Sequence, residues 1–168
     1  MIIAISNVLT AMFSPLVLCD GLIIIPVGSL LAGATFVVRD IVQLKNGKSK
    51  TYITILIAVA LSCVVSVSVG DTAYIAIASA VAFFISEAVD TEIYSRVKKS
   101  FARRVLLSGI VGGLIDSAVF VIVGLSPLGA GMISWLQTPF AIIGQVIAKS
   151  SVQVLATGLI LLRRNWGR

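Results

Sequence analysis

The sequence predicts an all-α integral membrane protein with six transmembrane helices, and three observations carry that prediction. Hydrophobic residues make up 58% of the 168 residues and charged residues only 12%, whereas soluble domains average about 45–50% apolar and about 25% charged residues. The mean hydropathy is +1.10. The apolar residues gather in runs close to the roughly 20 residues that a helix needs to cross a bilayer. A soluble fold this apolar would need a larger core than the chain can enclose.

Six apolar runs follow one another, and we expect one transmembrane domain over residues 1–168. The expected spans are 2–18, 21–38, 51–69, 72–94, 105–126 and 132–162. Two sets of three spans with opposite orientation are compatible with two inverted three-helix repeats, a common transporter design. The first run has no basic segment before it and another run follows closely, so we expect no cleavable signal peptide.

The basic residues predict the orientation. In the six-span arrangement, twelve of the thirteen fall on one side, in the segments 39–50, 96–104 and 163–168. The connections on the opposite side hold none. By the positive-inside rule, the basic side and both termini are cytoplasmic, which predicts a multi-pass protein of the cell (inner) membrane. The net charge of +6 therefore reflects topology and contact with anionic lipid, not nucleic-acid binding.

The first three spans carry few polar residues. Asn7 lies amid apolar residues of the first span, where its amide suits a ligand or an interhelical hydrogen bond equally well. The second span has small residues at one-turn spacing, which permit close helix contact, and ends at Arg39 and Asp40. These two residues form either an interfacial ion pair or part of a gate. We expect the third span to be scaffold.

The fourth span predicts one wall of a binding site. Glu87 and Asp90 are spaced i and i+3, so they share one helix face, and Tyr94 continues that face at i+7. Glu92 points away, toward the polar end. A carboxylate in hydrocarbon costs about 2.5–3.5 kcal/mol on insertion scales, so chains rarely keep one without a use.

The fifth span places a carboxylate beside a glycine motif. Gly109 and Gly113 form GxxxG, and Asp116 follows one turn later on the same face. The glycines let a partner backbone approach closely. Because lipid cannot solvate the carboxylate, we expect this face to look into the bundle.

The sixth span carries a polar stripe. Gln145, Lys149 and Gln153 are spaced i, i+4 and i+8, and Pro139 and Gly144 precede Lys149, so we expect the outer half to bend or unwind. Two interpretations of Lys149 stay open. It neutralises Asp116 or Glu87 as a buried ion pair, or the pair also faces a cavity and holds substrate or exchanges protons.

Several functional classes are excluded by composition. The chain has no histidine, and its two cysteines, Cys19 and Cys63, stand alone, so we expect no metal site, no cofactor and no enzymatic activity. There is no Walker motif or Gly-rich nucleotide loop. Any energy source is therefore ionic, such as proton coupling through the buried carboxylates, or belongs to another chain.

Three stretches then resemble one family. They are ASAVAFFISEAVDTEIYSRVKK, LLSGIVGGLIDSAVFVIV and IIGQVIAKSSVQVLATGLIL. The shared features are E-x-x-D followed by Y-S-x-x-K in the fourth helix, I-D-S in the fifth and G-Q-x-x-x-K in the sixth. They cover roughly residues 78–162 and resemble the VUT family, whose best-known members are bacterial queuosine-precursor transporters. The second helix reads LLAGATFVVRDIVQ, where longer members carry acidic residues, so the chain looks like a shorter branch.

The resemblance implies six helices and import of a small deazapurine, the cyano- or aminomethyl-deazaguanine used to make queuosine. Carried over by position, it implies these substrate-binding residues: Glu87, Asp90, Asp116, Gln145 and Lys149. The chemistry of these residues suits such a ligand. A guanine-like ring offers an N–H and an amino group on one edge, which a carboxylate accepts together, while glutamine both donates and accepts and lysine donates.

Two other functions remain open from the sequence. The first is a substrate-binding subunit of an energy-coupling-factor type vitamin importer, which has a similar size and needs separate ATPase and transmembrane partners. The second is a structural membrane protein whose buried charges form only ion pairs. Uptake by the chain alone distinguishes the first from a self-sufficient transporter, and charge-preserving swaps of Asp116 and Lys149 distinguish the second.

Overall fold

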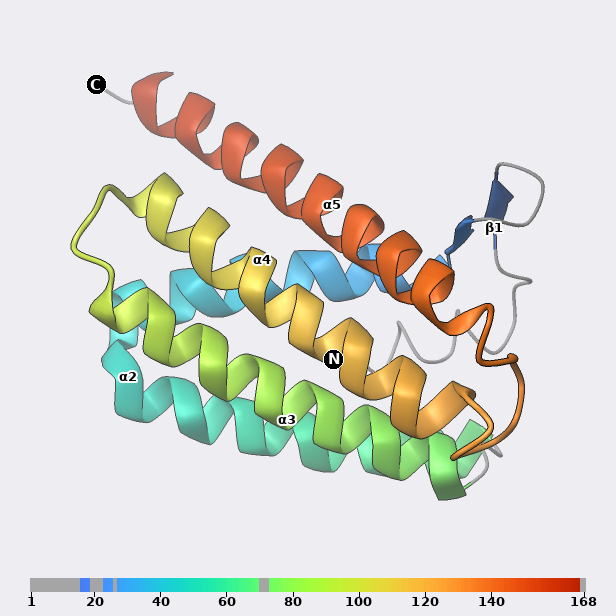
Figure 1. The fold of residues 1–168 in the computed structure, drawn as a ribbon. Helices are drawn as coiled ribbons and strands as arrows, with labels where there is room; N and C mark the ends of the chain where they lie inside the picture. Colours follow the sequence, from blue (N-terminus) through green and yellow to red (C-terminus); the bar gives the residue numbers. More distant parts are fainter. Residues whose placement is uncertain (1–15, 19–22, 26, 70–72, 167–168) are drawn as a thin grey trace.

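The computed structural model describes residues 16–18, 23–25, 27–69 and 73–166, and within them the chain is dominated by helices (Figure 1). The elements are β1 (Leu16–Leu18), β2 (Ile23–Ile25), α2 (Val27–Val69), α3 (Ala73–Arg96), α4 (Phe101–Val119), the π-helix η1 (Phe120–Leu125) and α5 (Thr138–Trp166). Three of the described helical stretches are long and apolar enough to cross a membrane: Gly33–Val65, Phe101–Leu125 and Thr138–Leu162. The chain is a multi-pass membrane protein on this evidence.

The beginning of the chain corrects one prediction. β1 and β2 pair antiparallel, with Leu16 opposite Ile25, where we expected the end of one helix and the start of the next. The strand residues are Leu-Val-Leu and Ile-Ile-Ile, and short apolar runs rich in β-branched residues form strands as readily as helices. The remainder of the expected span 2–18, with Asn7, lies outside the described residues.

Helix α2 corrects a second prediction. The segment 39–50, expected as a loop, is helical, and α2 holds both the second and the third expected spans. The helix breaks only at Gly47, whose φ of 79° and ψ of 173° are not helical and are accessible to glycine without strain. In Figure 1 the two arms of α2 meet at this break at the left. The first arm approaches α5, and the second runs beside α3.

The three later helices follow the predictions more closely. α3 spans 24 residues, which is about 36 Å at 1.5 Å per residue, and lies beside α4 in Figure 1. α4 continues into η1, and the loop after it folds back, with the Ala130 N–H donating to the Gly124 carbonyl at 2.9 Å. α5 is one continuous helix of 29 residues. The expected bend is absent because Pro139 sits in its first turn, where a missing N–H does no harm.

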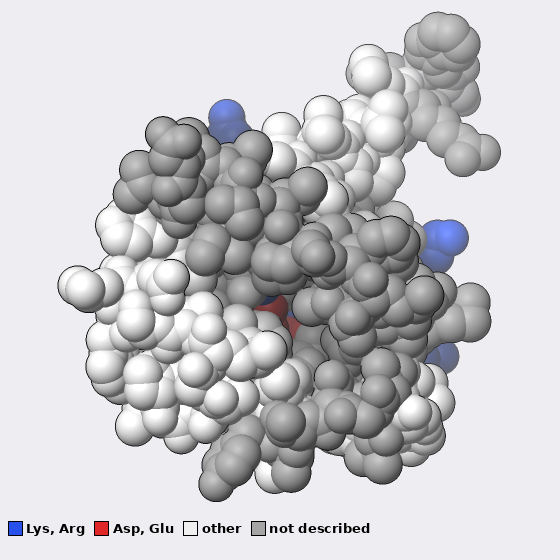
Figure 2. All heavy atoms as spheres, turned by 90° about the vertical axis from the view of Figure 1, so that its right-hand side faces the viewer, with Lys and Arg blue, Asp and Glu red and all other residues white. Residues whose placement is uncertain are grey.

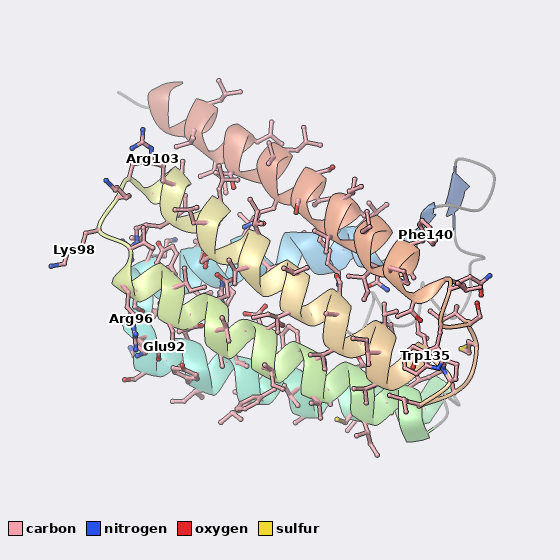
Figure 3. All side chains as sticks on the ribbon, in the orientation of Figure 1. Glu92, Arg96, Lys98, Arg103, Trp135 and Phe140 are labelled. Carbon is pink, nitrogen blue, oxygen red and sulfur yellow. The ribbon has the colours of Figure 1, made fainter. Side chains whose placement is uncertain are left out.

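The basic residues gather at one end of the described bundle. Arg96, Lys98 and Arg103 lie at the left of Figure 3, while Trp135 and Phe140 lie at the opposite end. We call the first of these the basic end. Arg39 and Lys149 are the exceptions among the described basic residues, because both are buried inside the bundle, Arg39 where we expected a loop. The number of six helices, the inverted repeat and the direction in which the basic end faces remain predictions.

Candidate functional site

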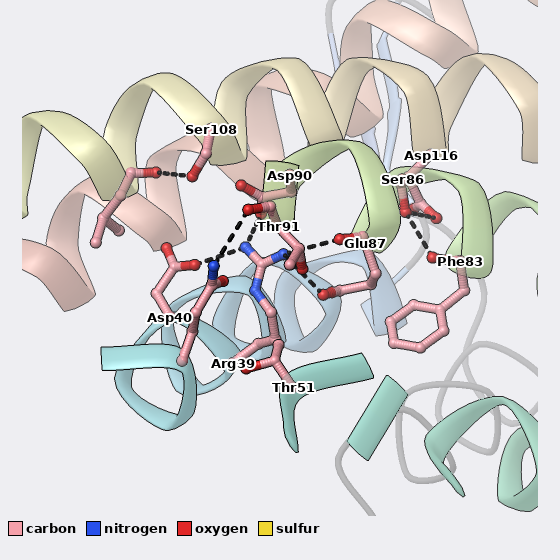
Figure 4. A network of polar contacts seen from close by, with 12 residues as sticks. Arg39, Asp40, Thr51, Phe83, Ser86, Glu87, Asp90, Thr91, Ser108 and Asp116 are labelled. Carbon is pink, nitrogen blue, oxygen red and sulfur yellow. Dashed lines mark hydrogen bonds and ion pairs between the residues drawn. The ribbon is translucent and has the colours of Figure 1, made fainter. Parts of the chain in front are cut away.

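Arg39 stands at the centre of a buried group of carboxylates. Its Nη2 lies 2.6 Å from Asp40 Oδ1 and also forms an ion pair with Asp90, and its Nη1 lies 3.1 Å from Glu87 Oε2. Arg39 is 5% exposed and the three acids are fully buried. We call these four residues the arginine cluster (Figure 4). One guanidinium therefore faces three carboxylates away from water.

The cluster joins α2 to α3 by further hydrogen bonds. Arg39 Nη1 donates to the Glu87 carbonyl at 3.1 Å and to Thr91 Oγ1 at 3.3 Å. One turn further along α2, Gln43 Nε2 donates to the Thr91 carbonyl at 3.1 Å and to Ser95 Oγ at 2.8 Å. The helical segment that we expected to be a loop is what carries Arg39 and Gln43 to this face of α3.

Lys149 organises a second polar group. Its Nζ donates to Asp116 Oδ2 at 2.6 Å, to Ser117 Oγ at 2.9 Å and to Gln145 Oε1 at 3.1 Å. The ammonium has three N–H donors, so all three are used. Lys149 is 3% exposed, while Asp116 is half-buried. We call these four residues the lysine cluster. It joins α4 to α5.

Small residues bring the helices close enough to build the lysine cluster. A Cβ on Gly33 of α2 would lie 2.7 Å from the Lys149 carbonyl oxygen, so the backbones of α2 and α5 cross there. Gly113 of α4 faces the Lys149 side chain, and Gly109 faces Gln153. The GxxxG face therefore packs on the polar stripe of α5, as we expected for a face that carries a buried carboxylate.

The two clusters meet on consecutive residues of α3. Glu87 belongs to the arginine cluster, and its neighbour Ser86 donates to Asp116 Oδ1 at 3.4 Å. Figure 4 shows both contacts on the same stretch of α3. Gly112 of α4 lies against Asp90, where a Cβ would be 3.0 Å from the Asp90 Cβ. One continuous polar layer thus runs from α2 through α3 and α4 to α5.

Acidic atoms are visible from one end of the bundle. Figure 2 looks onto the end where α5 begins, opposite the basic end, and shows acidic atoms inside a hollow near the middle of that face. Glu92, by contrast, lies outside the layer at the basic end and pairs with Lys48 at 2.6 Å and Arg96 at 3.6 Å. Its orientation agrees with the prediction that it points away from the Glu87 face.

Chemically, the layer combines acceptors, donors and charge. Asp40 Oδ2 and Glu87 Oε1 are among the buried acceptor atoms that have no hydrogen-bond partner in the described part of the chain. Gln145 adds an amide to the layer, and its carbonyl oxygen is the atom that accepts from Lys149. A planar ligand with N–H groups on one edge and a carbonyl on another would find matching partners on both sides.

The layer contains most of the residues that the sequence singled out. Glu87 and Asp90 lie in one cluster, and Asp116, Gln145 and Lys149 lie in the other. Arg39 and Asp40, expected as a gate or an interfacial ion pair, do pair with each other, but the pair is buried, and Arg39 also pairs with Glu87 and Asp90. Within the described residues, no group of three or more His, Cys, Asp or Glu side chains is arranged to hold a metal ion.

Comparison with known proteins identifies a family for the chain. Residues 66–163, more than half of the chain, match the family described as "putative vitamin uptake transporter". The matched region contains α3, α4 and α5 up to residue 163, and so every residue of the lysine cluster. No curated protein and no solved structure matches the chain. The chain belongs to the VUT family of vitamin uptake transporters.

Proposed function

We propose that the chain imports a small planar polar compound, a deazaguanine precursor of queuosine, and binds it in the polar layer between the two clusters. The observation that carries the proposal is the position of Asp116. Its Oδ2 accepts from Lys149 and its Oδ1 accepts from Ser86, and its side chain remains half-buried. It is the one acid of the layer that is paired and still accessible.

The chemistry of the site matches a guanine-like ring. The N–H and amino group on one edge of the ring are both accepted by a single carboxylate, and Asp116 or Glu87 supplies it. The ring carbonyl accepts from the Gln145 amide or the Lys149 ammonium. Asn7 completes the set of substrate-binding residues that we propose, from the part of the chain outside the described residues.

Transport through this layer does not require nucleotide hydrolysis by the chain. The buried carboxylates offer sites for proton coupling, with Glu87, Asp90 and Asp116 as the groups that exchange protons. We propose that the basic end is cytoplasmic in the cell inner membrane, since the exposed lysines and arginines there follow the positive-inside rule.

Uptake of labelled cyano-deazaguanine and labelled aminomethyl-deazaguanine tests the proposal. The host cells lack their own importer and the biosynthetic pathway, and the chain is the only addition. We expect accumulation of at least one label with the wild-type chain and with the control Glu92→Gln, and background levels with Asp116→Asn. Accumulation of neither label by well-expressed protein contradicts the proposal of a self-sufficient transporter.

The same assay separates the energy-coupling-factor alternative. If accumulation appears only when the ATPase and transmembrane subunits of such an importer are co-expressed, the chain is a substrate-binding subunit. The family is described by vitamin uptake, which favours testing this second possibility.

A further inference from the structure

We infer that the polar layer selects a substrate that carries a positive charge, such as a protonated amine or an amidinium group, over a neutral or anionic compound of the same shape. The inference rests on the proposed transport function and adds the charge of the substrate to it. The observation behind the inference is the balance of buried charges in the arginine cluster and the lysine cluster.

The layer holds more acids than bases. Asp40, Glu87 and Asp90 are fully buried, and Asp116 is half-buried. The buried cations that face them are Arg39, paired with the first three, and Lys149, paired with Asp116. Two cations against four carboxylates leave a formal excess of two negative charges. Charge in a medium of low dielectric constant is costly unless it is compensated.

The other lysines and arginines whose side chains the structure describes do not supply the missing cations; Arg163, Arg164 and Arg168 lie outside the described side chains. Residues 1–29 and 70–72 contain no lysine or arginine. Among the side chains that the structure describes, the other lysines and arginines are exposed, with the exception of Arg104. Arg104 donates to the Tyr94 carbonyl at 3.0 Å and lies 4.0 Å from the centroid of its ring. No ion pair between Arg104 and a described carboxylate is present.

Among the described residues of the layer, several buried acceptor atoms lack a hydrogen-bond partner, against one buried donor, Arg39 Nε. Asp40 Oδ2 and Glu87 Oε1 are buried acceptors without a partner in the described chain, and so is Gln43 Oε1. Gln43 is not an acid, which makes it an observation independent of the charge count. Its amide is anchored on Thr91, the residue whose hydroxyl also accepts from Arg39. A ligand that donates several N–H groups and carries a positive charge would compensate the excess negative charge and would supply donors to the buried acceptors.

Organic cations fit this layer better than a metal ion. The described side chains contain no arrangement of three or more His, Cys, Asp or Glu that holds a metal. The guanidinium of Arg39 already occupies the centre of the carboxylates and shows which chemistry they accept: planar N–H donors with delocalised positive charge. Protonation of two carboxylates is the competing way to balance the charge, and it predicts no preference for a cationic ligand.

A matched pair of ligands tests the inference. Aminomethyl-deazaguanine is a cation at neutral pH and cyano-deazaguanine is neutral, and both share one ring. Binding of each is measured to the purified full chain in lipid nanodiscs at one pH and ionic strength. We expect the cation to bind at least about tenfold more tightly, a difference of about 1.4 kcal/mol. Equal or tighter binding of the neutral ligand overturns the inference.

Asp40→Asn tests the source of the preference. The variant removes one of the excess charges with little change of shape, and we expect the preference for the cation to fall below about threefold, because each close charge pair contributes on this scale. Glu92→Gln removes the same charge outside the layer and retains the preference. A preference unchanged in Asp40→Asn overturns the inference, and Asp90→Asn replaces that variant if it does not fold.

The outcome is separable from the substrate proposal. If neither deazaguanine binds, the proposed substrate is wrong, and the charge inference is decided with thiamine, a cation, against neutral riboflavin and anionic biotin. Thermal stabilisation of the protein by thiamine alone supports it. Stabilisation by riboflavin or biotin, or by none of the three, overturns it.

Discussion

Lys149 on α5 reaches Asp116 on α4, with 2.6 Å between the ammonium nitrogen and carboxylate Oδ2. The pair lies where α5 packs closely against both α2 and α4. Gly113 lies against the Lys149 side chain, and Gly33 lies against the Lys149 backbone. A buried lysine in a membrane helix is costly alone, so this contact ties the position of α5 to the polar layer.

Asp116→Asn and Lys149→Met each leave one charge of the pair unpartnered. We expect each variant to lose uptake of labelled deazaguanine to background, because substrate contact and charge balance both depend on the pair. Membrane expression should stay near normal, since the helix crossings remain. Uptake at the wild-type rate by both variants, measured at equal expression, contradicts the site assignment.

Exchanging the two charges separates a functional pair from a structural one. In Asp116→Lys with Lys149→Asp, the ion pair can re-form while the donor and acceptor exchange places. A purely structural pair would restore uptake. We expect expression to stay near normal and uptake to remain below about a tenth of the wild-type rate, which is a loss of more than about 1.4 kcal/mol in transition-state stabilisation.

Arg39→Gln tests the role of the arginine cluster in stability. The substitution leaves three buried carboxylates without a cation, and breaking a buried ion pair in this way costs about 3–5 kcal/mol. We expect a large fall in the thermal unfolding temperature of the detergent-solubilised protein. Arg96→Gln is the matched control, because Arg96 is 82% exposed. Adding Asp40→Asn to Arg39→Gln should recover part of the loss. Equal unfolding temperatures for the wild type and all three variants would contradict a stabilising role of the arginine cluster.

Gly33→Ala tests the crossing of α2 and α5. The added methyl group would meet backbone atoms of Lys149, which cannot move aside as a flexible side chain can. We expect a loss of about 1–3 kcal/mol in the free energy of unfolding. Gly158→Ala on α5 is the control because nothing lies within 4 Å of its Cβ position, and the gain in helix propensity there is about 1 kcal/mol. Similar unfolding curves for the two variants would contradict the close approach of α2 and α5 at Gly33.

The polar layer was more predictable than the helix boundaries. Asp116 and Lys149 stand in the middle of long apolar runs, where the cost of a lone charge favours pairing, so the sequence indicates an ion pair of Lys149 with either Asp116 or Glu87. Arg39 stands at the end of an apolar run, where polar residues follow, and that pattern is typical of the end of a helix. The structure continues the helix to Gly47. Only a tertiary contact, with Asp90 of α3, identifies Arg39 as a buried residue.

The strands near the start of the chain had a local signal that hydropathy hides. Asp20 and Gly21 stand between the two apolar runs that form β1 and β2, and Asp-Gly flanked by apolar residues is typical of a β-hairpin. The length of the two apolar runs, taken alone, favoured helices there. The continuity of α5 was also mispredicted, because a proline acts differently in the first turn of a helix than in its interior.

The most direct test of the central claim is uptake of labelled aminomethyl- and cyano-deazaguanine by cells that carry this chain as their only importer. We expect the label to accumulate, faster for the aminomethyl compound. Accumulation should be lost in Asp116→Asn and fully retained in Glu92→Gln. Absence of accumulation of both compounds by correctly inserted protein, with and without energy-coupling-factor partners, would contradict the central claim.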